Sequence, residues 1–105
     1  LDRLADAEAA AGAMAGPGET LPLALEVSDA DSVAAAVAAV VEQWGAPEIL
    51  VNNAGTTVFV TDYADLDALT NEVWDRILGL NVKSAFFAAR AVAPHLRAVG
   101  GGAIV

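Results

Sequence analysis

The sequence predicts an α/β fold with a doubly wound parallel sheet, and three observations support this. Helical and strand-like patterns alternate along the 105 residues. The strand-like patterns are unbroken apolar runs, which indicates strands that are covered on both faces. A helical stretch separates each run from the next, as in right-handed crossovers between parallel strands.

The first expected helix covers residues 2–14, which are rich in alanine. The run Gly16-Pro17-Gly18 follows it and should end it. Residues 21–27 form a short apolar run, which we expect to be the first strand. Pro22 is tolerable there because it lies near the beginning of the run.

A second helix should begin at Ser28, because Ser28 and Asp31 have the spacing of a capping box, with Asp in place of the usual Glu or Gln. Its apolar positions, which share one helical face, are Val33, Val37, Val40, Val41 and Trp44. Gly45 and Pro47 should end the helix. Residues 49–51 then form the second expected strand.

Residues 56–69 read as an irregular segment. Thr70 can cap a long helix, with Glu72 near its positive end, and this helix should run to about Ala98. Pro94 is expected to kink its last turns. Gly100-Gly101-Gly102 reads as a turn, and a last strand opens at residue 103. We expect Trp44 and Trp74 to anchor the core.

Composition and charge narrow the class of protein. The chain is 56% hydrophobic with a mean hydropathy of +0.52, so a substantial core is expected. Its net charge is −9, which argues against nucleic acid and anionic membranes as partners. It contains no cysteine, and no apolar run approaches the roughly 20 residues that cross a bilayer. We therefore expect a cytoplasmic protein.

The two ends of the chain also carry an expectation. Leu1 lies within a helical pattern, and residues 103–105 read as the beginning of a strand. We therefore expect residues 1–105 to form one partial domain that is truncated at both ends. No cluster of histidine and carboxylate side chains has the spacing of metal ligands, so no metal site is expected.

The stretch Asn52-Asn53-Ala54-Gly55 follows the second strand directly. In an open parallel sheet, ligands bind beyond the carboxyl ends of the strands. Small residues there allow a ligand to approach the backbone, and amides offer donors and acceptors without charge. On dipeptide chemistry alone, an ordinary turn after the strand explains the pair of asparagines equally well.

Asn81 is the second candidate, because an asparagine within a helix is mildly unfavourable. Counted from Trp74 it lies two turns further on, so we place it on the core-facing side. The apolar stripe assigned to that side consists of Trp74, Ile77, Leu78, Val82 and Phe86. A buried amide needs a hydrogen-bond partner, and a satisfied core amide remains an alternative to a functional one.

Four stretches together resemble the middle of the short-chain dehydrogenase/reductase family. They are LEVSDADSV, WGAPEILVNNAG, VWDRILGLNVKSAFF and GGGAIV, and the resemblance covers essentially all 105 residues. The resemblance implies a partial Rossmann-type sheet that binds NAD or NADP. It also implies hydride transfer between nicotinamide and a carbonyl or alcohol carbon of a small substrate.

The family pattern assigns roles residue by residue. Asn52 would tie the central sheet, and Asn53, Ala54 and Gly55 would lie against the cofactor ribose. Asn81 matches the asparagine of the catalytic proton relay, which is held in a kinked helix. Glu26 and Val27 match the pair that meets the adenine, although the family usually has Asp where this chain has Glu26.

Other family features find no match. The catalytic Ser, Tyr and Lys cannot be assigned, because the only tyrosine, Tyr63, is followed four residues later by Asp67. No glycine-rich phosphate loop is present, since Gly100-Gly101-Gly102 precedes a strand rather than a helix. We therefore expect the chain alone to be inactive and unstable, or prone to aggregate.

Two alternatives to the enzyme remain open: a non-catalytic relative that binds a nucleotide or partner, and an extended relative such as a sugar-nucleotide epimerase. In the family, the long helix often packs against its twin, and Phe86, Phe87, Ala88 and Ala89 would suit such a contact. We therefore expect a homodimer or homotetramer. Substrate, reaction direction and the choice between NAD and NADP stay open.

Overall fold

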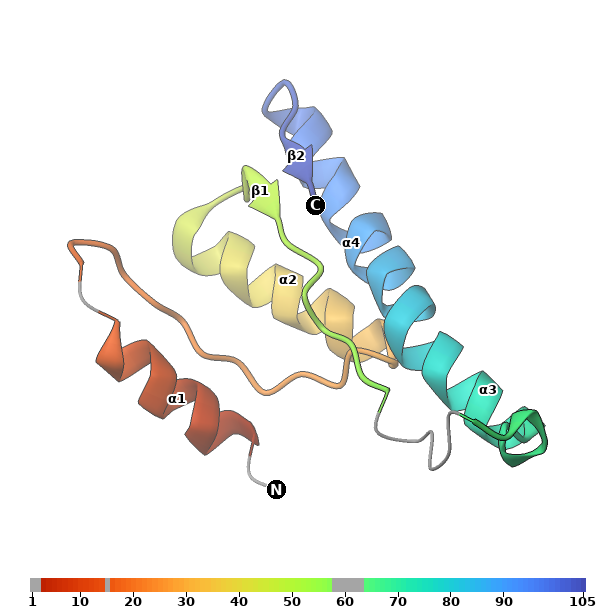
Figure 1. Cartoon of the computed structure of the whole chain (residues 1–105). Coiled ribbons are helices and arrows are strands. Elements are labelled where there is room, and N and C mark those ends of the chain that lie inside the picture. Colours follow the sequence, from red (N-terminus) through yellow and green to blue (C-terminus); the bar gives the residue numbers. More distant parts are fainter. Residues whose placement is uncertain (1–2, 15, 58–63) are drawn as a thin grey trace.

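The computed structural model describes residues 3–14, 16–57 and 64–105 (Figure 1). The elements are α1 (Arg3–Ala13), α2 (Ala30–Trp44), β1 (Ile49–Leu50), a 3-10 helix (Leu66–Ala68), α3 (Asn71–Leu78), a π turn (Gly79–Lys83), α4 (Ser84–Ala98) and β2 (Ala103–Ile104). They make a partial α/β unit in which helices connect the strands. Their order matches the expected alternation of helix and strand from α2 onward, but within the described ranges no strand lies between α1 and α2.

Strands β1 and β2 are parallel, as predicted, with Ile49 opposite Ala103 and Leu50 opposite Ile104. The pairing continues beyond the strands, because the N–H of Val105 donates to the Leu50 carbonyl at 2.9 Å. The long helix provides the crossover between them, and α4 packs against both α2 and β1. Helix α4 therefore contacts both the sheet and the neighbouring helix α2.

The prediction of a strand over residues 21–27 was wrong. The only sheet within the described residues contains β1 and β2, and residues 21–27 run as irregular chain. Leu23 and Leu25 nevertheless face α2 and Ile49 around an apolar hollow of about 260 Å³. An apolar run specifies burial, but a strand also needs a neighbouring backbone, and none pairs with this segment in the described structure.

Helix α2 begins one residue later than predicted, because Asp29 and not Ser28 caps it. The Ser32 N–H donates to Asp29 Oδ1 at 2.7 Å. Ser28 instead donates to Glu26 Oε1, from its hydroxyl at 2.6 Å and from its N–H at 3.2 Å. The predicted end is confirmed: Gly45 has φ +84° and its N–H donates to the Val41 carbonyl at 2.9 Å.

The long helix begins at the predicted cap. The Val73 N–H donates to Thr70 Oγ1 at 3.3 Å. A hydrogen bond from its own backbone, and another from the Thr70 hydroxyl, hold the pKa of Glu72 below its ordinary value of 4.5. Because the folded pKa is lowered, this interaction stabilises the fold above pH 4.5 and is lost as the pH falls through the folded pKa.

The same helix departs from α geometry in its middle. The departure is the π turn Gly79–Lys83, whereas α4 continues as an α-helix through Pro94, where we predicted a kink. After α4, the N–H groups of Gly100 and Gly101 donate to the carbonyls of Arg97 and Leu96, at 3.2 and 2.8 Å. This pattern is a Schellman motif, for which Gly100 supplies the positive φ of +91°.

The chain is less compact than its length allows. Its radius of gyration is 16.2 Å, against about 13 Å for a typical domain of this length. Its accessible surface is 7532 Å², against about 5,500 Å² for a compact monomer of this mass. Among the side chains that the structure describes, the buried apolar ones are Val33, Val92 and Leu96.

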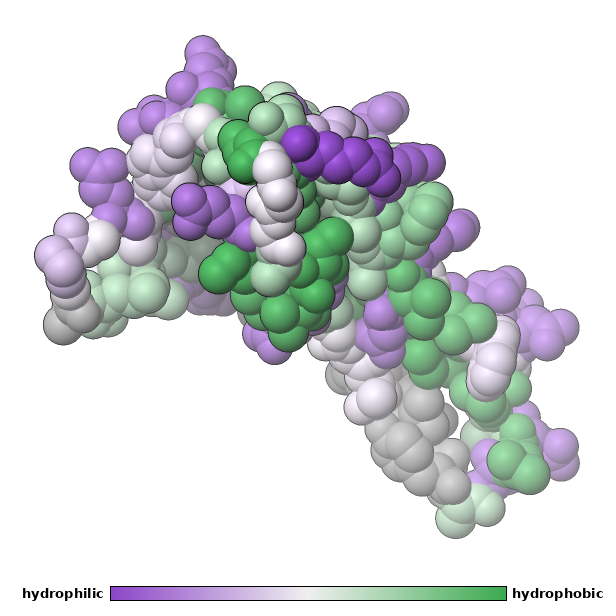
Figure 2. All heavy atoms as spheres, turned by 90° about the horizontal axis from the view of Figure 1, so that it is seen from above, coloured by the Kyte–Doolittle hydropathy of each residue, from purple (hydrophilic) through white to green (hydrophobic). Residues whose placement is uncertain are grey.

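Much apolar surface consequently faces solvent, and Figure 2 shows hydrophobic residues gathered on the outside of the molecule. Trp44 and Trp74, predicted as core anchors, are about half exposed, and the indole N–H of Trp44 donates to Glu19 Oε2 at 3.0 Å. The stripe predicted to face the core is also largely exposed, at Trp74, Leu78, Val82 and Phe86. The prediction that this stripe faces the core was therefore wrong: periodicity identifies an apolar helix face but does not say what covers it.

Candidate functional site

The segment that leaves β1 passes across α2 and beside the long helix (Figure 1). Asn52 is its second residue and ties the two strands together at their carboxyl ends. Its backbone N–H donates to the Val105 carbonyl at 2.7 Å, and its side-chain Nδ2 donates to the same carbonyl at 3.2 Å. The sheet-tying role that the family pattern implied for Asn52 is therefore confirmed.

Asn81 binds the same segment from the long helix. Its Oδ1 accepts from the Thr56 N–H at 2.7 Å, and its Nδ2 donates to the Thr56 carbonyl at 2.8 Å. The two bonds fix the orientation of the amide, because the acceptor faces an N–H and the donor faces a carbonyl. We call this pair of hydrogen bonds the Asn81–Thr56 clamp; it supplies the partner that a half-buried amide requires.

Gly55 is small because the clamp passes close to it. A Cβ atom on Gly55 would lie 3.1 Å from Asn81 Oδ1, which is tighter than ordinary van der Waals contact. The two predicted candidates therefore meet at one place, although they are 26 positions apart in the sequence.

Three of the predicted binding residues border one hollow of about 150 Å³. Val27 comes from the irregular segment before α2, and Asn53 and Ala54 come from the segment after β1. Ser84 and Ala88 of α4 form the opposite wall, and the remaining lining residues are Leu25, Val33, Leu50, Val51 and Asn52. No charged side chain lines this hollow among the described residues, so it suits a neutral, partly apolar group.

Glu26 lies apart from that hollow. It borders a second, wider one together with Ser28, Asp75, Arg76 and Lys83. Its Oε1 already accepts both hydrogen bonds from Ser28, and its backbone N–H donates to Ser32 Oγ at 2.9 Å. The Glu26 side chain, which is longer than the Asp usual in the family, thus folds back onto its own turn.

Two further residues contribute to the site in ways that the sequence did not predict. Thr56 acts through its backbone, so no side-chain pattern could have identified it as the partner of Asn81. Ser84 follows Asn81 by three positions within the helix, and a serine in a helix interior is a signal for a bond to the backbone. Its hydroxyl donates to the Leu80 carbonyl.

The remaining expectations concern residues and features that do not belong to this site. Tyr63 lies outside the described residues, and Asp67 belongs to the 3-10 helix. In the part of the chain that the structure describes, no three His, Asp or Glu side chains converge as metal ligands. None of the helices in that part is long and apolar enough to span a bilayer.

A parallel strand pair joined by a helical crossover, with a neutral hollow beyond the carboxyl ends of the strands, defines a Rossmann-type α/β fold. The family model for short chain dehydrogenases matches residues 2–105. The chain therefore belongs to the short-chain dehydrogenase family.

Individual relatives agree with this. A 2-(R)-hydroxypropyl-CoM dehydrogenase from Xanthobacter autotrophicus is 39% identical over 87 residues, which cover 83% of this chain and 34% of the relative. A 3-ketoacyl-ACP reductase from Sinorhizobium meliloti superposes with a TM-score of 0.82 at 30% identity, over 96% of this chain and 39% of its own.

A metagenomic short-chain oxidoreductase, solved in complex with NADP, superposes with a TM-score of 0.73 at 31% identity. That match covers 84% of this chain and 38% of the oxidoreductase. The chain therefore spans about a third of the length of the relatives that it matches.

Proposed function

We propose that the protein carrying this chain is an NAD- or NADP-dependent oxidoreductase. It would transfer a hydride between nicotinamide and a carbonyl or alcohol carbon of a small-molecule substrate. The observation that carries the proposal is the Asn81–Thr56 clamp beside a neutral hollow at the end of β1. Membership of the family and the dehydrogenase and reductase names of the relatives support it.

The residues present fit a dinucleotide. Asn53, Ala54 and Gly55 would lie against the cofactor ribose, and Val27 would border the adenine. The hollow of about 150 Å³ is smaller than the roughly 300 Å³ or more of a typical ligand pocket. We therefore propose that residues 1–105 form the central part of a larger nucleotide-binding domain and are inactive alone.

Glu26 is also proposed as an adenine contact. The position of its carboxylate is set by the turn that it forms with Ser28. The hydrogen bonds from Ser28 to Oε1 hold the carboxylate close to its own turn, so it would meet the nucleotide from that position. Asn81 is proposed as the catalytic residue of this chain. It would hold part of a proton relay at the nicotinamide end of the site. When bound, the nicotinamide supplies the hydride chemistry.

The test uses the complete gene product that carries this chain, titrated with NAD and NADP and assayed with a panel of alcohols and ketones. Ala54→Phe should fill the hollow and weaken nucleotide binding by about tenfold or more. Ala38→Phe, on the exposed face of α2, is the matched control and should bind like the parent.

The outcomes separate the candidates. Nucleotide-dependent turnover that Ala54→Phe weakens supports the oxidoreductase. Nucleotide binding without turnover of any substrate favours the non-catalytic relative. A gene product that binds neither nucleotide, or whose Ala54→Phe variant binds both normally, contradicts the proposed site.

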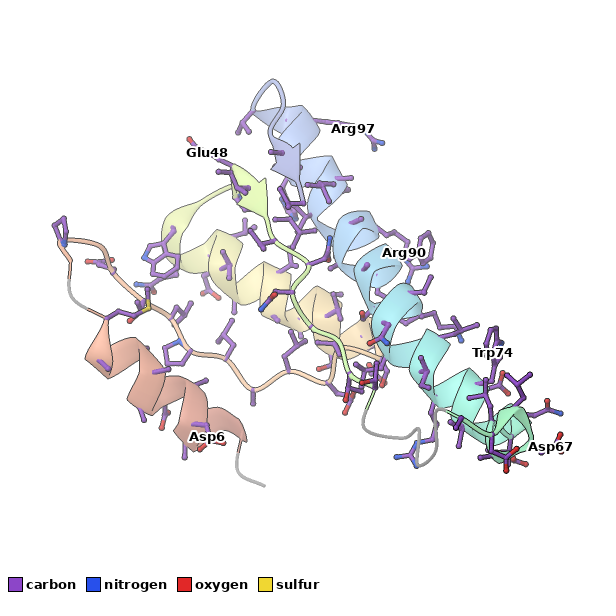
Figure 3. All side chains as sticks on the ribbon, in the orientation of Figure 1. Asp6, Glu48, Asp67, Trp74, Arg90 and Arg97 are labelled. Atoms are coloured by element: carbon purple, nitrogen blue, oxygen red, sulfur yellow. The ribbon has the colours of Figure 1, made fainter. Side chains whose placement is uncertain are left out.

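We also propose that the protein is a homodimer or homotetramer that uses the outer face of the long helix. Trp74, Leu78, Val82 and Phe86 recur every four residues and are 40 to 59% exposed. Figure 3 shows Trp74 and Arg90 projecting from this side, and the Arg90 guanidinium lies 5.2 Å from the ring centres of Phe86 and Phe87. Ala88 is unavailable for this contact because it lines the hollow.

Light scattering tests this assembly. Phe86→Glu should release monomers, because it places a charge within the apolar face. Met14→Glu, at an exposed apolar position just after α1, should not. A monomeric parent protein would contradict the proposal.

We further propose a cytoplasmic location without nucleic-acid or membrane partners. The net charge of −9 supports this proposal, and recovery of the protein in the membrane fraction would contradict it.

A further inference from the structure

The π turn Gly79–Lys83 needs something to stabilise it. In a regular α-helix, the carbonyl of Leu80 would accept from the N–H of residue 84, four positions on. A π turn shifts this pairing by one residue and is rare, and it occurs mostly as a single turn within an α-helix. A carbonyl at such a turn therefore benefits from a second donor.

Ser84 supplies that donor. It is the first residue of α4 and only 6% exposed, and among the side chains that the structure describes it is the buried polar one. Its hydroxyl donates to the carbonyl of Leu80, the same group that a regular α-helix would pair with the Ser84 N–H. The side chain thus replaces a bond that the π turn displaces.

The π turn in turn sets the direction of Asn81, which lies at its centre. Successive residues of an α-helix are about 100° apart, so removing the extra residue of the turn would rotate α3 against α4 by about that angle. Val92 and Leu96 hold α4 in the core. The rotation would therefore fall on the side of Asn81 and would take its amide away from Thr56.

We propose that Ser84 is a positioning residue: its hydroxyl holds the π turn and thereby keeps Asn81 in the Asn81–Thr56 clamp. The effect on turnover rests on the proposed function, because it passes through Asn81. The effect on the clamp does not, because it concerns hydrogen bonds of the chain itself.

Amide hydrogen exchange of the complete gene product tests the clamp directly. The Thr56 N–H reports on the bond to Asn81, and the Val105 N–H, which donates to the Leu50 carbonyl, reports on the strands. Ser84→Ala should speed exchange at Thr56 by about tenfold relative to Val105. Ser84→Thr keeps the hydroxyl, has the adjoining hollow for its methyl group, and should restore slow exchange at Thr56.

Val92→Ala is the control for general loss of stability. It removes buried apolar atoms from the same helix, so exchange at Thr56 and Val105 should rise by similar factors. In the active enzyme, Ser84→Ala should lower kcat and leave the KM for the nucleotide within about twofold, because the defect lies in the relay and not in the binding wall.

Two results would overturn the proposal: unchanged Thr56 exchange in Ser84→Ala, or equal acceleration at Thr56 and Val105. A faster Thr56 in a protein without any oxidoreductase activity would uphold the role of Ser84 and reject the proposed function. The exchange measurement therefore separates a failure of this inference from a failure of the enzyme assignment.

Discussion

Gly102→Ala is expected to lower the free energy of unfolding of the complete gene product by about 3 kcal/mol. A Cβ atom at this position would overlap the carbonyl oxygen of Glu48 and would lie 2.6 Å from Cδ2 of Leu96. The leucine side chain is buried at 6% exposure and has little room to move. The Glu48 carbonyl accepts from the Ala103 N–H at 3.0 Å, so moving it would separate β1 from β2.

Chemical denaturation measures this effect, and Gly12→Ala is its matched control. Gly12 lies within α1 with open space around it, so alanine there should stabilise the helix by up to about 1 kcal/mol. The two substitutions add the same methyl group and should have opposite signs. Equal stability of Gly102→Ala and the parent would mean that β1 and the turn before β2 are not in contact as described.

Asn81→Asp should have the largest effect on activity, a fall in turnover of about 10²-fold at neutral pH. The substitution replaces the Nδ2 donor, 2.8 Å from the Thr56 carbonyl, by an oxygen. An ionised carboxylate there repels that carbonyl, whereas a protonated one can donate to it. We therefore expect the pKa of the new carboxyl group to be raised above the usual Asp value of about 3.9.

The sign of the pH dependence follows from that shift. Because the folded pKa is raised, the variant keeps most of its stability below the unfolded value and loses it as the pH rises through the folded value. Asn81→Ala removes both bonds at every pH and should cost about 2 kcal/mol throughout. Denaturation of both variants at several pH values checks this, and a constant difference between them would contradict the clamp.

Much of the scaffold could be predicted from local sequence signals. The Thr70 cap and the Gly45 stop follow from side chains close in sequence. The parallel direction of the strands follows from the helical stretch that separates the two apolar runs. The sheet-tying role of Asn52 came from the resemblance, and its bond to Val105 confirms it. These features depend on few neighbours, so a single sequence specifies them well.

The errors arose where a distant partner decides the structure. Residues 21–27 have the composition of a strand, but no backbone in the described ranges pairs with them. The error at the start of α2 is different, because it is local: Ser28 pairs with Glu26, two residues back, and Asp29 caps the helix instead. The exposed stripe at Trp74 and Phe86 has the periodicity of a core face, which is also the periodicity of an interface.

The candidate site was predicted only in part, because some of its contacts depend on partners that the sequence does not reveal. Asn53, Ala54 and Val27 border one hollow, and Gly55 meets Asn81, so their proximity agrees with the roles proposed for them. The partner of Asn81 is a backbone group, and the π turn that directs it is a property of the whole helix. Residue types alone identified neither of them, and the kink at Asn81 was expected only from the resemblance.

The most direct measurement is a crystal structure of the complete gene product with NAD or NADP bound. We expect the nucleotide to lie across the carboxyl ends of β1 and β2, in contact with residues 53–55, with Val27 at one side and the Asn81–Thr56 clamp intact. A nucleotide bound elsewhere, or a hollow filled by the protein's own bulky side chains, would contradict the proposed role of this site.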